Sequence, residues 1–235
     1  MKIGSATKRW QAAYELSKVL NNPKTIPTDI SFKGQMISSY KHSINDDPLV
    51  RAYLAIAMGA AGDNYYAKEL IVGLKDDSRE SRLASIQAVG MVKALEALPQ
   101  LSRIVTKSDY PDERLAATMA IGFIGSPSSI PILKELLEDE EPNIRWDAAI
   151  GLAKMGDKSS APIIENLMDR DYLSSFPELD FKEVNKVIMI AIEASKMVQD
   201  KRFEPKLVLL AETDKSLKIR DAAMKTLKNS YNRII

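Results

Sequence analysis

The chain has 235 residues, of which 45% are hydrophobic and 28% charged, so it carries enough apolar material for a folded core and is not a disordered tail. Lys and Arg number 33 against 32 Asp and Glu, and the net charge of +1 provides no whole-chain field that would recruit nucleic acid or an anionic membrane. The absence of cysteine and the single histidine, His42, exclude disulfide scaffolds, Cys-based metal sites, thiol nucleophiles and clusters of His ligands.

The N-terminal residues contain no apolar run followed by a small-residue cleavage site, so we expect no signal peptide. No stretch approaches the ~18 apolar residues of a membrane span. We therefore expect a cytoplasmic protein without membrane insertion.

The sequence repeats itself with a period of 31 or 32 residues. In chain order, a weak first copy (KRWQAAYELSKVL, with Arg9) precedes four phased copies around Arg51, Arg82, Arg114 and Arg145, a degenerate copy around Ile188 and a last one at Arg220. Two longer steps indicate insertions near 21–32 and 171–179. Each copy but the last contains two apolar-periodic segments, which predicts six helical hairpins and a final polar helix that caps the stack.

Prolines and glycines mark the helix ends within the copies. Pro48, Pro111 and Pro142 each stand three residues before an arginine, where a first-turn proline costs no hydrogen bond. Gly62, Gly125 and Gly156 follow their arginines by eleven residues, where glycine can adopt the positive φ that ends a helix. A second set, Gly59, Gly90 and Gly122, follows by eight.

This pattern, D-P-x-V-R-x-x-A-A-x-A-L-G-x-x-G-D with departures, is clearest at 47–63 and 141–157. It resembles the HEAT-repeat family, specifically the short HEAT-like repeats of the phycobilin-lyase type. The resemblance implies an all-α fold, an α-α superhelix or HEAT-like solenoid, over a single domain 1–235 with its clearest repeats at 46–168. It does not specify a function.

The recurring arginines have two readings. They could form a basic ladder that grips phosphates or acidic peptides, or they could hydrogen-bond one hairpin to the next beside acidic residues at Asp47, Asp77, Asp109 and Glu141. We favour the structural ladder, which the family resemblance also implies; its members are Arg51, Arg82, Arg114, Arg145 and Arg220.

Catalytic chemistry finds little support. His42 stands at a polar helix end, where a surface or capping position is the expected role. The acidic run 135–141 does not follow the ligand order of an EF-hand calcium site. One histidine cannot supply the paired iron ligands of deoxyhypusine hydroxylase, a HEAT-like enzyme. Trp146, Asp147 and Arg145 have the residue types of the HEAT-like DNA glycosylases, but adjacent helical residues point about 100° apart. We expect no catalytic residue, cofactor or metal. We interpret Met58, Met119 and Met155 as packing residues rather than as a soft binding surface.

The insertions are the candidate binding elements. Apolar residues stand in both: Tyr172, Leu173, Phe176 and Leu179 in the second, Ile26 and Ile30 in the first. They either contact a partner or fold back to seal the core. Charge is also unevenly distributed, with net +5 over 1–44, −6 over 109–141 and +5 over 201–235, which suits electrostatic choice of a partner.

These observations favour a non-enzymatic scaffold or adaptor, monomeric without its partner, that binds another protein through its concave surface and insertion loops. The alternative is a bilin or cofactor lyase, or a lyase-like chaperone subunit, which rests on the family resemblance. Nucleic-acid binding by the basic ends is a third, less favoured hypothesis.

Overall fold

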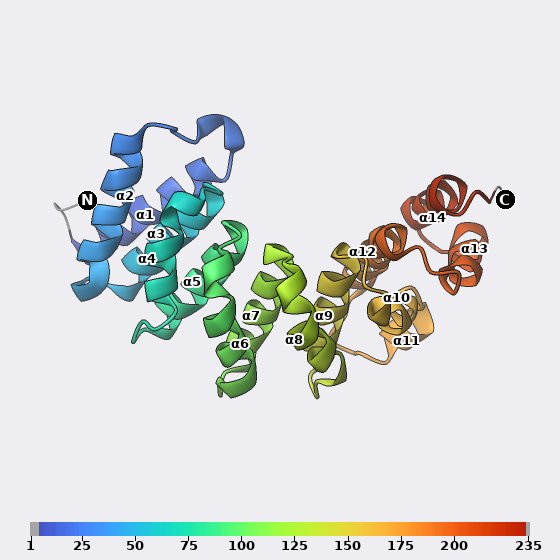
Figure 1. Cartoon of the computed structure of the whole chain (residues 1–235). Helices are drawn as coiled ribbons and strands as arrows, with labels where there is room; N and C mark the ends of the chain where they lie inside the picture. The colour runs from blue at the N-terminus through green and yellow to red at the C-terminus, as the bar shows by residue number, and fades with distance from the viewer. Residues whose placement is uncertain (1–4, 234–235) are drawn as a thin grey trace. The chain divides into compact units, whose positions relative to one another are not determined.

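The computed structural model describes residues 5–233, and every regular element in that range is helical (Figure 1). The α-helices are α1 (Ala6–Leu20), α2 (Ile30–His42), α3 (Pro48–Ala60), α4 (Ala67–Gly73), α5 (Arg79–Met91), α6 (Leu98–Lys107), α7 (Pro111–Ile124), α8 (Ile130–Glu135), α9 (Pro142–Lys154), α10 (Ala161–Leu167), α11 (Arg170–Ser174), α12 (Phe181–Val198), α13 (Phe203–Thr213) and α14 (Leu217–Ser230). Over the described residues, six hairpins and a last helix are present as predicted. Helix α11 is an addition inside the second insertion.

Each hairpin has a first helix (α1, α3, α5, α7, α9 or α12) and a second helix (α2, α4, α6, α8, α10 or α13). The predicted prolines begin three first helices, α3, α7 and α9. At α3 the side chain of Asp47 also accepts a hydrogen bond of 2.9 Å from the Leu49 amide, which satisfies an otherwise unpaired donor of the first turn.

The predicted glycine ends are confirmed. Gly62, Gly125 and Gly156 have φ of 64°, 65° and 72°, the left-handed region that a β-carbon disfavours. Two further copies adopt the same conformation without glycine, since Lys93 and Gln199 have φ of 54° and 50° at the equivalent position. The turn geometry therefore recurs even where the residue type does not favour it.

The earlier glycine of each copy has a different purpose. A β-carbon on Gly59 would lie 2.8 Å from the Ala88 Cα atom, and one on Gly90 would lie 2.8 Å from the Ala120 Cα atom. Bare glycines at these positions thus let α3, α5 and α7 pack directly against one another.

The chain forms two compact units, Met1–Ile124 (unit 1) and Gly125–Ile235 (unit 2), and the boundary in the sequence falls between α7 and α8. In unit 1 the first helices α1, α3, α5 and α7 lie side by side in one layer, with α4 and α6 packed on α5 and α7. In unit 2 the core gathers around Trp146, Ile188 and Phe203 from α9, α12 and α13. A single domain over 1–235 stays a prediction.

Candidate functional site

The second insertion packs onto the core of unit 2. Leu173 is fully buried, and Tyr172, Phe176 and Leu179 are half-buried against the same core. Trp146 Nε1 donates a hydrogen bond of 3.2 Å to the Tyr172 hydroxyl, and the Phe176 ring meets the Trp146 ring edge-on with centroids 4.8 Å apart. These contacts seal the hairpin, and partner binding by the four residues stays a prediction.

The first insertion lies between α1 and α2 in unit 1. Ile26 is half-buried in the loop, whereas Ile30 is exposed at the first position of α2. The two insertions therefore belong to different units. Partner binding by Ile26 and Ile30 also stays a prediction.

The arginines of the predicted ladder bond to the main chain. Four of them donate to carbonyl oxygens at or just after the C-terminal end of the preceding second helix, where carbonyls lack helical partners. The pairs are Arg51 to Tyr40 (2.7 Å), Arg82 to Asp76 and Asp77 (2.9 and 3.0 Å), Arg114 to Val105 (2.9 Å), and Arg145 to Asp139 and Glu140 (2.6 and 2.9 Å). Each arginine thus links its own first helix to the hairpin before it.

Carboxylates also bind Arg51 and Arg82. Arg51 Nε donates to Asp76 in the turn after α4, and Arg82 donates twice to Glu113 of the next first helix, at 3.1 and 2.8 Å. Arg220 differs, because its buried Nε has no hydrogen-bond acceptor among the described residues.

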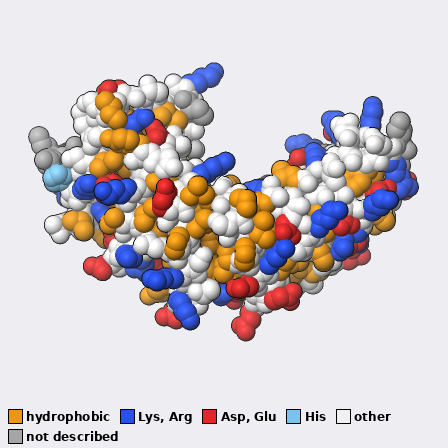
Figure 2. Space-filling model, viewed as in Figure 1, with side chains coloured by type: hydrophobic (Ala, Val, Ile, Leu, Met, Phe, Trp, Pro, Cys, Tyr) orange, Lys and Arg blue, Asp and Glu red, His pale blue; other side chains and the backbone are white. Residues whose placement is uncertain are grey.

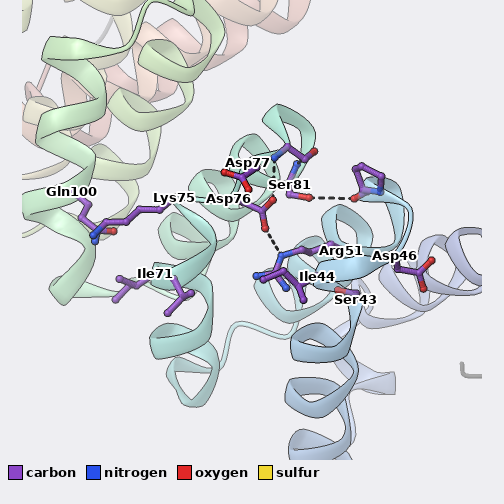
Figure 3. A pocket seen from close by; sticks show the side chains of 13 residues that line it. Ser43, Ile44, Asp46, Arg51, Ile71, Lys75, Asp76, Asp77, Ser81 and Gln100 are labelled. Atoms are coloured by element: carbon purple, nitrogen blue, oxygen red, sulfur yellow. Dashed lines mark hydrogen bonds and ion pairs between the residues drawn. The ribbon is translucent and has the colours of Figure 1, made fainter.

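Figure 3 shows a pocket in unit 1 with both polar and apolar lining residues, which has a volume of about 580 Å³ and is lined by the α2–α3 turn, the α4–α5 turn and residues of α4 and α6. Its buried Arg51 is bound by Asp76 and lies 4.0 Å above the Tyr40 ring, so its charge is already balanced. Ser81 Oγ donates to the Pro48 carbonyl at 3.3 Å. The Arg51 and Ser81 contacts hold two hairpins together and leave the serine hydroxyl facing a carbonyl rather than a base.

The residues considered for chemistry are dispersed. His42 is exposed at the end of α2, with Nδ1 2.6 Å from the Ser38 carbonyl oxygen of its own helix. Trp146 points into the core of unit 2, while Arg145 bonds to the preceding turn. Across residues 5–233 no group of three or more His, Cys, Asp or Glu is placed to hold a metal ion.

Exposed apolar side chains lie on two neighbouring first helices of unit 1, α5 and α7. Five and nine residues after the arginine, α7 carries Met119 and Phe123, which are 42% and 49% exposed. On the neighbouring α5, the ninth position holds the exposed Met91, whose sulfur approaches the Gly59 position of α3. We call Met91, Met119 and Phe123 the first-helix row.

Unit 2 carries an apolar groove on its own first helices. It has a volume of about 220 Å³ between α9 and α12 and is lined by Ile150, Lys154, Met189, Ile190, Glu193, Ala194 and Met197. Ile190 and Met197 are 45% and 51% exposed. Side chains of this kind on an exposed surface are typical of protein contacts.

Helix α9 lacks a glycine at the close-packing position. Ala153 stands where α3 and α5 carry Gly59 and Gly90, and the equivalent of Ala88 and Ala120 on α12 is Ala194, which lines the groove. Both positions therefore carry a β-carbon, whereas in unit 1 one position of each pair is a bare glycine.

Asp147 lies on the face of α9 that carries Ile150 and Lys154, since positions three and seven residues apart share a helix face. Burial raises the pKa of its carboxyl to about 6, and the positive charge of Lys154 opposes this only in part. No hydrogen bond or ion pair of the Asp147 carboxylate is found within the described chain.

The packing interpretation of the three methionines holds for Met58 and fails for Met119. Met58 is fully buried, Met155 is half-buried, and Met119 is 42% exposed. The three stand at different distances from their arginines, so they are not equivalent positions. Aligning the fifth and ninth positions after each arginine would have separated Met119 from the core residues.

Acidic side chains gather at the turn between α8 and α9, along the lower edge of the molecule in Figure 2. Glu135, Glu138, Glu140 and Glu141 are exposed there.

In the described range, no helix is long and apolar enough to cross a membrane.

The sequence profile for HEAT repeats matches residues 42–122 and 103–174, more than half of the chain. The chain belongs to the HEAT-repeat family. A search of curated proteins finds no match to this HEAT-repeat protein.

Solved structures share the fold at low sequence identity. The complex of CpcE and CpcF of phycocyanin lyase from Nostoc sp. PCC7120 is similar with a TM-score of 0.62 and 17% identity, covering 96% of this chain and 83% of that one. YibA of E. coli is similar with a TM-score of 0.55 and 20% identity, covering 95% and 82%. These likenesses confirm the all-α HEAT-like fold class.

Proposed function

We propose that this HEAT-repeat protein is a protein-binding scaffold that engages its partner with the outer faces of its first helices. The observation that carries the proposal is the first-helix row: Met91 and Phe123 occupy equivalent positions of α5 and α7, and Met119 lies about one turn before Phe123 on α7. Core packing does not require these side chains to face outward, whereas a partner surface would bury them.

Contact chemistry supports a protein partner. Methionine and phenylalanine are adaptable, high-area contact residues, and burying them against a partner contributes about 25 cal/mol per Å². The surrounding charges vary along the chain, from the basic ends to the acidic turn after α8, and would favour a partner of complementary pattern. The concave surface and the insertion loops, which the sequence indicated as binding elements, are further contact regions in this proposal.

The test is affinity capture from a soluble extract of the source cell with wild-type protein, Met119→Asp and Leu209→Asp. Leu209 is 53% exposed and lies on α13, a second helix, so Leu209→Asp is a matched control for adding a charge to an exposed apolar position. We expect one protein to be recovered by the wild type and by Leu209→Asp and lost with Met119→Asp. Equal recovery by all three would refute a contact on the first-helix row.

A second candidate is a bilin or cofactor lyase, or a lyase-like chaperone subunit. The observation that favours it is the similarity to the CpcE–CpcF complex of a phycocyanin lyase. Incubation with a bilin and an acceptor protein, followed by denaturing electrophoresis, separates the candidates. Covalent colour on the acceptor would establish the lyase, and its absence alongside specific capture would favour the scaffold.

A further inference from the structure

Helix α14 has a face on which no further helix of the described chain packs closely. It packs against α12 and α13, whereas α3 packs between α1 and α5, and α5 packs between α3 and α7. In unit 1 the position eight residues after the arginine faces the next first helix, as Gly59 and Gly90 do. On α14 the positions three before Arg220 and four and eight after it lie on the same helix face as Arg220. We call this set the α14 end face: Leu217, Arg220, Met224 and Lys228.

This face is buried in earlier hairpins and exposed on α14. The fourth position after the arginine is fully buried on α3, α5 and α9, where it is Ala55, Ile86 and Ala149. On α14 that position is Met224, which is 42% exposed, and Leu217 on the same face is 71% exposed. Exposed apolar side chains about two turns apart on one helix face are typical of a contact with another helix.

Arg220 lacks the acceptor that its counterparts in unit 1 have. Arg9, Arg51 and Arg82 each donate from Nε to a carboxylate at or just before the start of the next first helix; these acceptors are Asp46, Asp76 and Glu113. Arg220 is half-buried, and its buried Nε has no acceptor among the described residues. A buried donor without an acceptor costs free energy, and a carboxylate is the acceptor that the other copies supply.

The acidic groups near the α14 end face are already paired. Arg170 donates to both oxygens of Asp214, and Lys225 pairs with Asp221 at 2.7 Å. Arg220 acts on Asp214 through its charge, but the side-chain hydrogen bonds to Asp214 come from Arg170. Helix α14 itself carries four basic residues and one acidic residue. An acidic ligand is therefore complementary to this end of unit 2.

We propose that the α14 end face binds an acidic amphipathic helix of another protein, which covers Leu217 and Met224 with apolar side chains and places carboxylates beside Arg220 and Lys228. The two basic residues are about 12 Å apart along the helix axis, so the carboxylates of the ligand should stand seven or eight residues apart with an apolar residue between them. The apolar side chains favour a peptide over the phosphate backbone of a nucleic acid. This surface lies in unit 2 and is additional to the first-helix row.

The test uses a displayed library of 20-residue helix-forming peptides, selected on the full-length wild-type protein and counter-selected on Met224→Asp. Leu209→Asp is the control for the added charge, because Leu209 is 53% exposed on α13 and lies outside the α14 end face. Arg220→Gln and Lys228→Gln each remove one basic group, and Lys218→Gln, at an exposed position of α14 outside this face, is their control. Circular dichroism verifies that each variant folds as the wild type does.

We expect the enriched peptides to be acidic and to bind wild type, Leu209→Asp and Lys218→Gln equally, but Met224→Asp at least tenfold more weakly. Replacing one peptide carboxylate by an amide should weaken binding to wild type about fivefold and leave binding to Arg220→Gln nearly unchanged. A second carboxylate, seven or eight residues away, should show the same dependence on Lys228, with an effect of about twofold. If Arg220→Gln does not fold, the exposed Lys228 provides the pairing test by itself.

The inference would be overturned if no peptide preferred wild type to Met224→Asp, if the enriched peptides were not acidic, or if their carboxylates mattered equally for wild type and for the Gln variants. Tighter binding of a 20-base-pair DNA duplex would assign the face to nucleic acid instead. Self-association of the wild type that Met224→Asp abolishes, without peptide binding, would assign it to a second copy of the chain. Met119→Asp should bind the peptides as wild type does, so failure of the capture test in unit 1 and failure here are separate results.

Discussion

Replacing Asp147 by Asn should stabilise the protein at neutral pH and not in acid. Burial raises the pKa of the Asp147 carboxyl from 3.8 to about 6, so the folded state holds a proton that the unfolded chain releases between these values. Folded stability therefore falls as the pH rises through this window. A difference of about two in pKa corresponds to about 3 kcal/mol above pH 6, and residual solvent contact reduces the expected gain to about 1–3 kcal/mol.

The measurement is urea unfolding followed by circular dichroism at pH 7.5 and pH 4. We expect Asp147→Asn to exceed wild type by about 1–3 kcal/mol at pH 7.5 and by about 0.5 kcal/mol or less at pH 4. Asp221→Asn is the control, because Asp221 is exposed on α14 and its change should stay within about 0.5 kcal/mol at both values.

Carbon-13 NMR of the Asp147 carboxyl tests the same reasoning directly. The titration midpoint should lie near pH 6, because burial disfavours the carboxylate. A midpoint near 4, or an equal advantage of Asp147→Asn at both pH values, would show that the carboxylate is well solvated and would refute the argument.

Three further changes probe the fold. Gly62→Ala should lower the free energy of unfolding by about 1 kcal/mol, because Gly62 has a φ of 64° that a β-carbon disfavours. Gly34→Ala should raise it by about 0.5 kcal/mol, because Gly34 lies inside α2 with open space around it. Thermal melts of the two variants compare these effects. Lys93→Gly should raise the free energy of unfolding in urea by about 0.5 kcal/mol, because glycine adopts the left-handed φ of 54° without steric strain. A lower free energy of unfolding would contradict this account of the turn. Asp214→Ala should lower the free energy of unfolding by about 2–3 kcal/mol, since the half-buried Arg170 donates to both oxygens of the buried Asp214 at 2.6 and 2.9 Å; unchanged urea unfolding would show that the pair adds nothing.

The structure also affects how the second insertion can be studied. A Tyr172→Ala, Phe176→Ala double variant removes rings that pack on Trp146, so lost binding would be inseparable from lost folding. Changes at exposed positions, such as Met119→Asp on the first-helix row, avoid this difficulty.

The sequence alone predicts the repeats, because the ends of a helix and its apolar face depend on residues close together in the chain. Proline at a first turn and glycine at a left-handed end act within one turn of chain, so Pro48 and Gly62 mark boundaries without knowledge of any neighbour. The period of 31 or 32 residues then predicts how many hairpins there are, and the family follows from the same residues.

Which residues contact one another depends on how the hairpins pack together, and the sequence of a single repeat does not determine that packing. The arginine ladder was visible as a pattern, but its bonds to carbonyl oxygens at the ends of second helices depend on how the hairpins stack. The same holds for Met119, which shares its residue type with the buried Met58 and differs only in the face it occupies.

The sequence by itself determined the all-α class, the six hairpins with a last helix, and the position of both insertions, because these depend on periodicity and on residues near one another in the chain. Only the tertiary structure decided that Phe176 packs on Trp146, that an apolar groove lies between α9 and α12, and that burial raises the pKa of the Asp147 carboxyl. Those outcomes depend on the separation of helices that are distant in sequence, and one methyl group at a close-packing position is enough to change that separation.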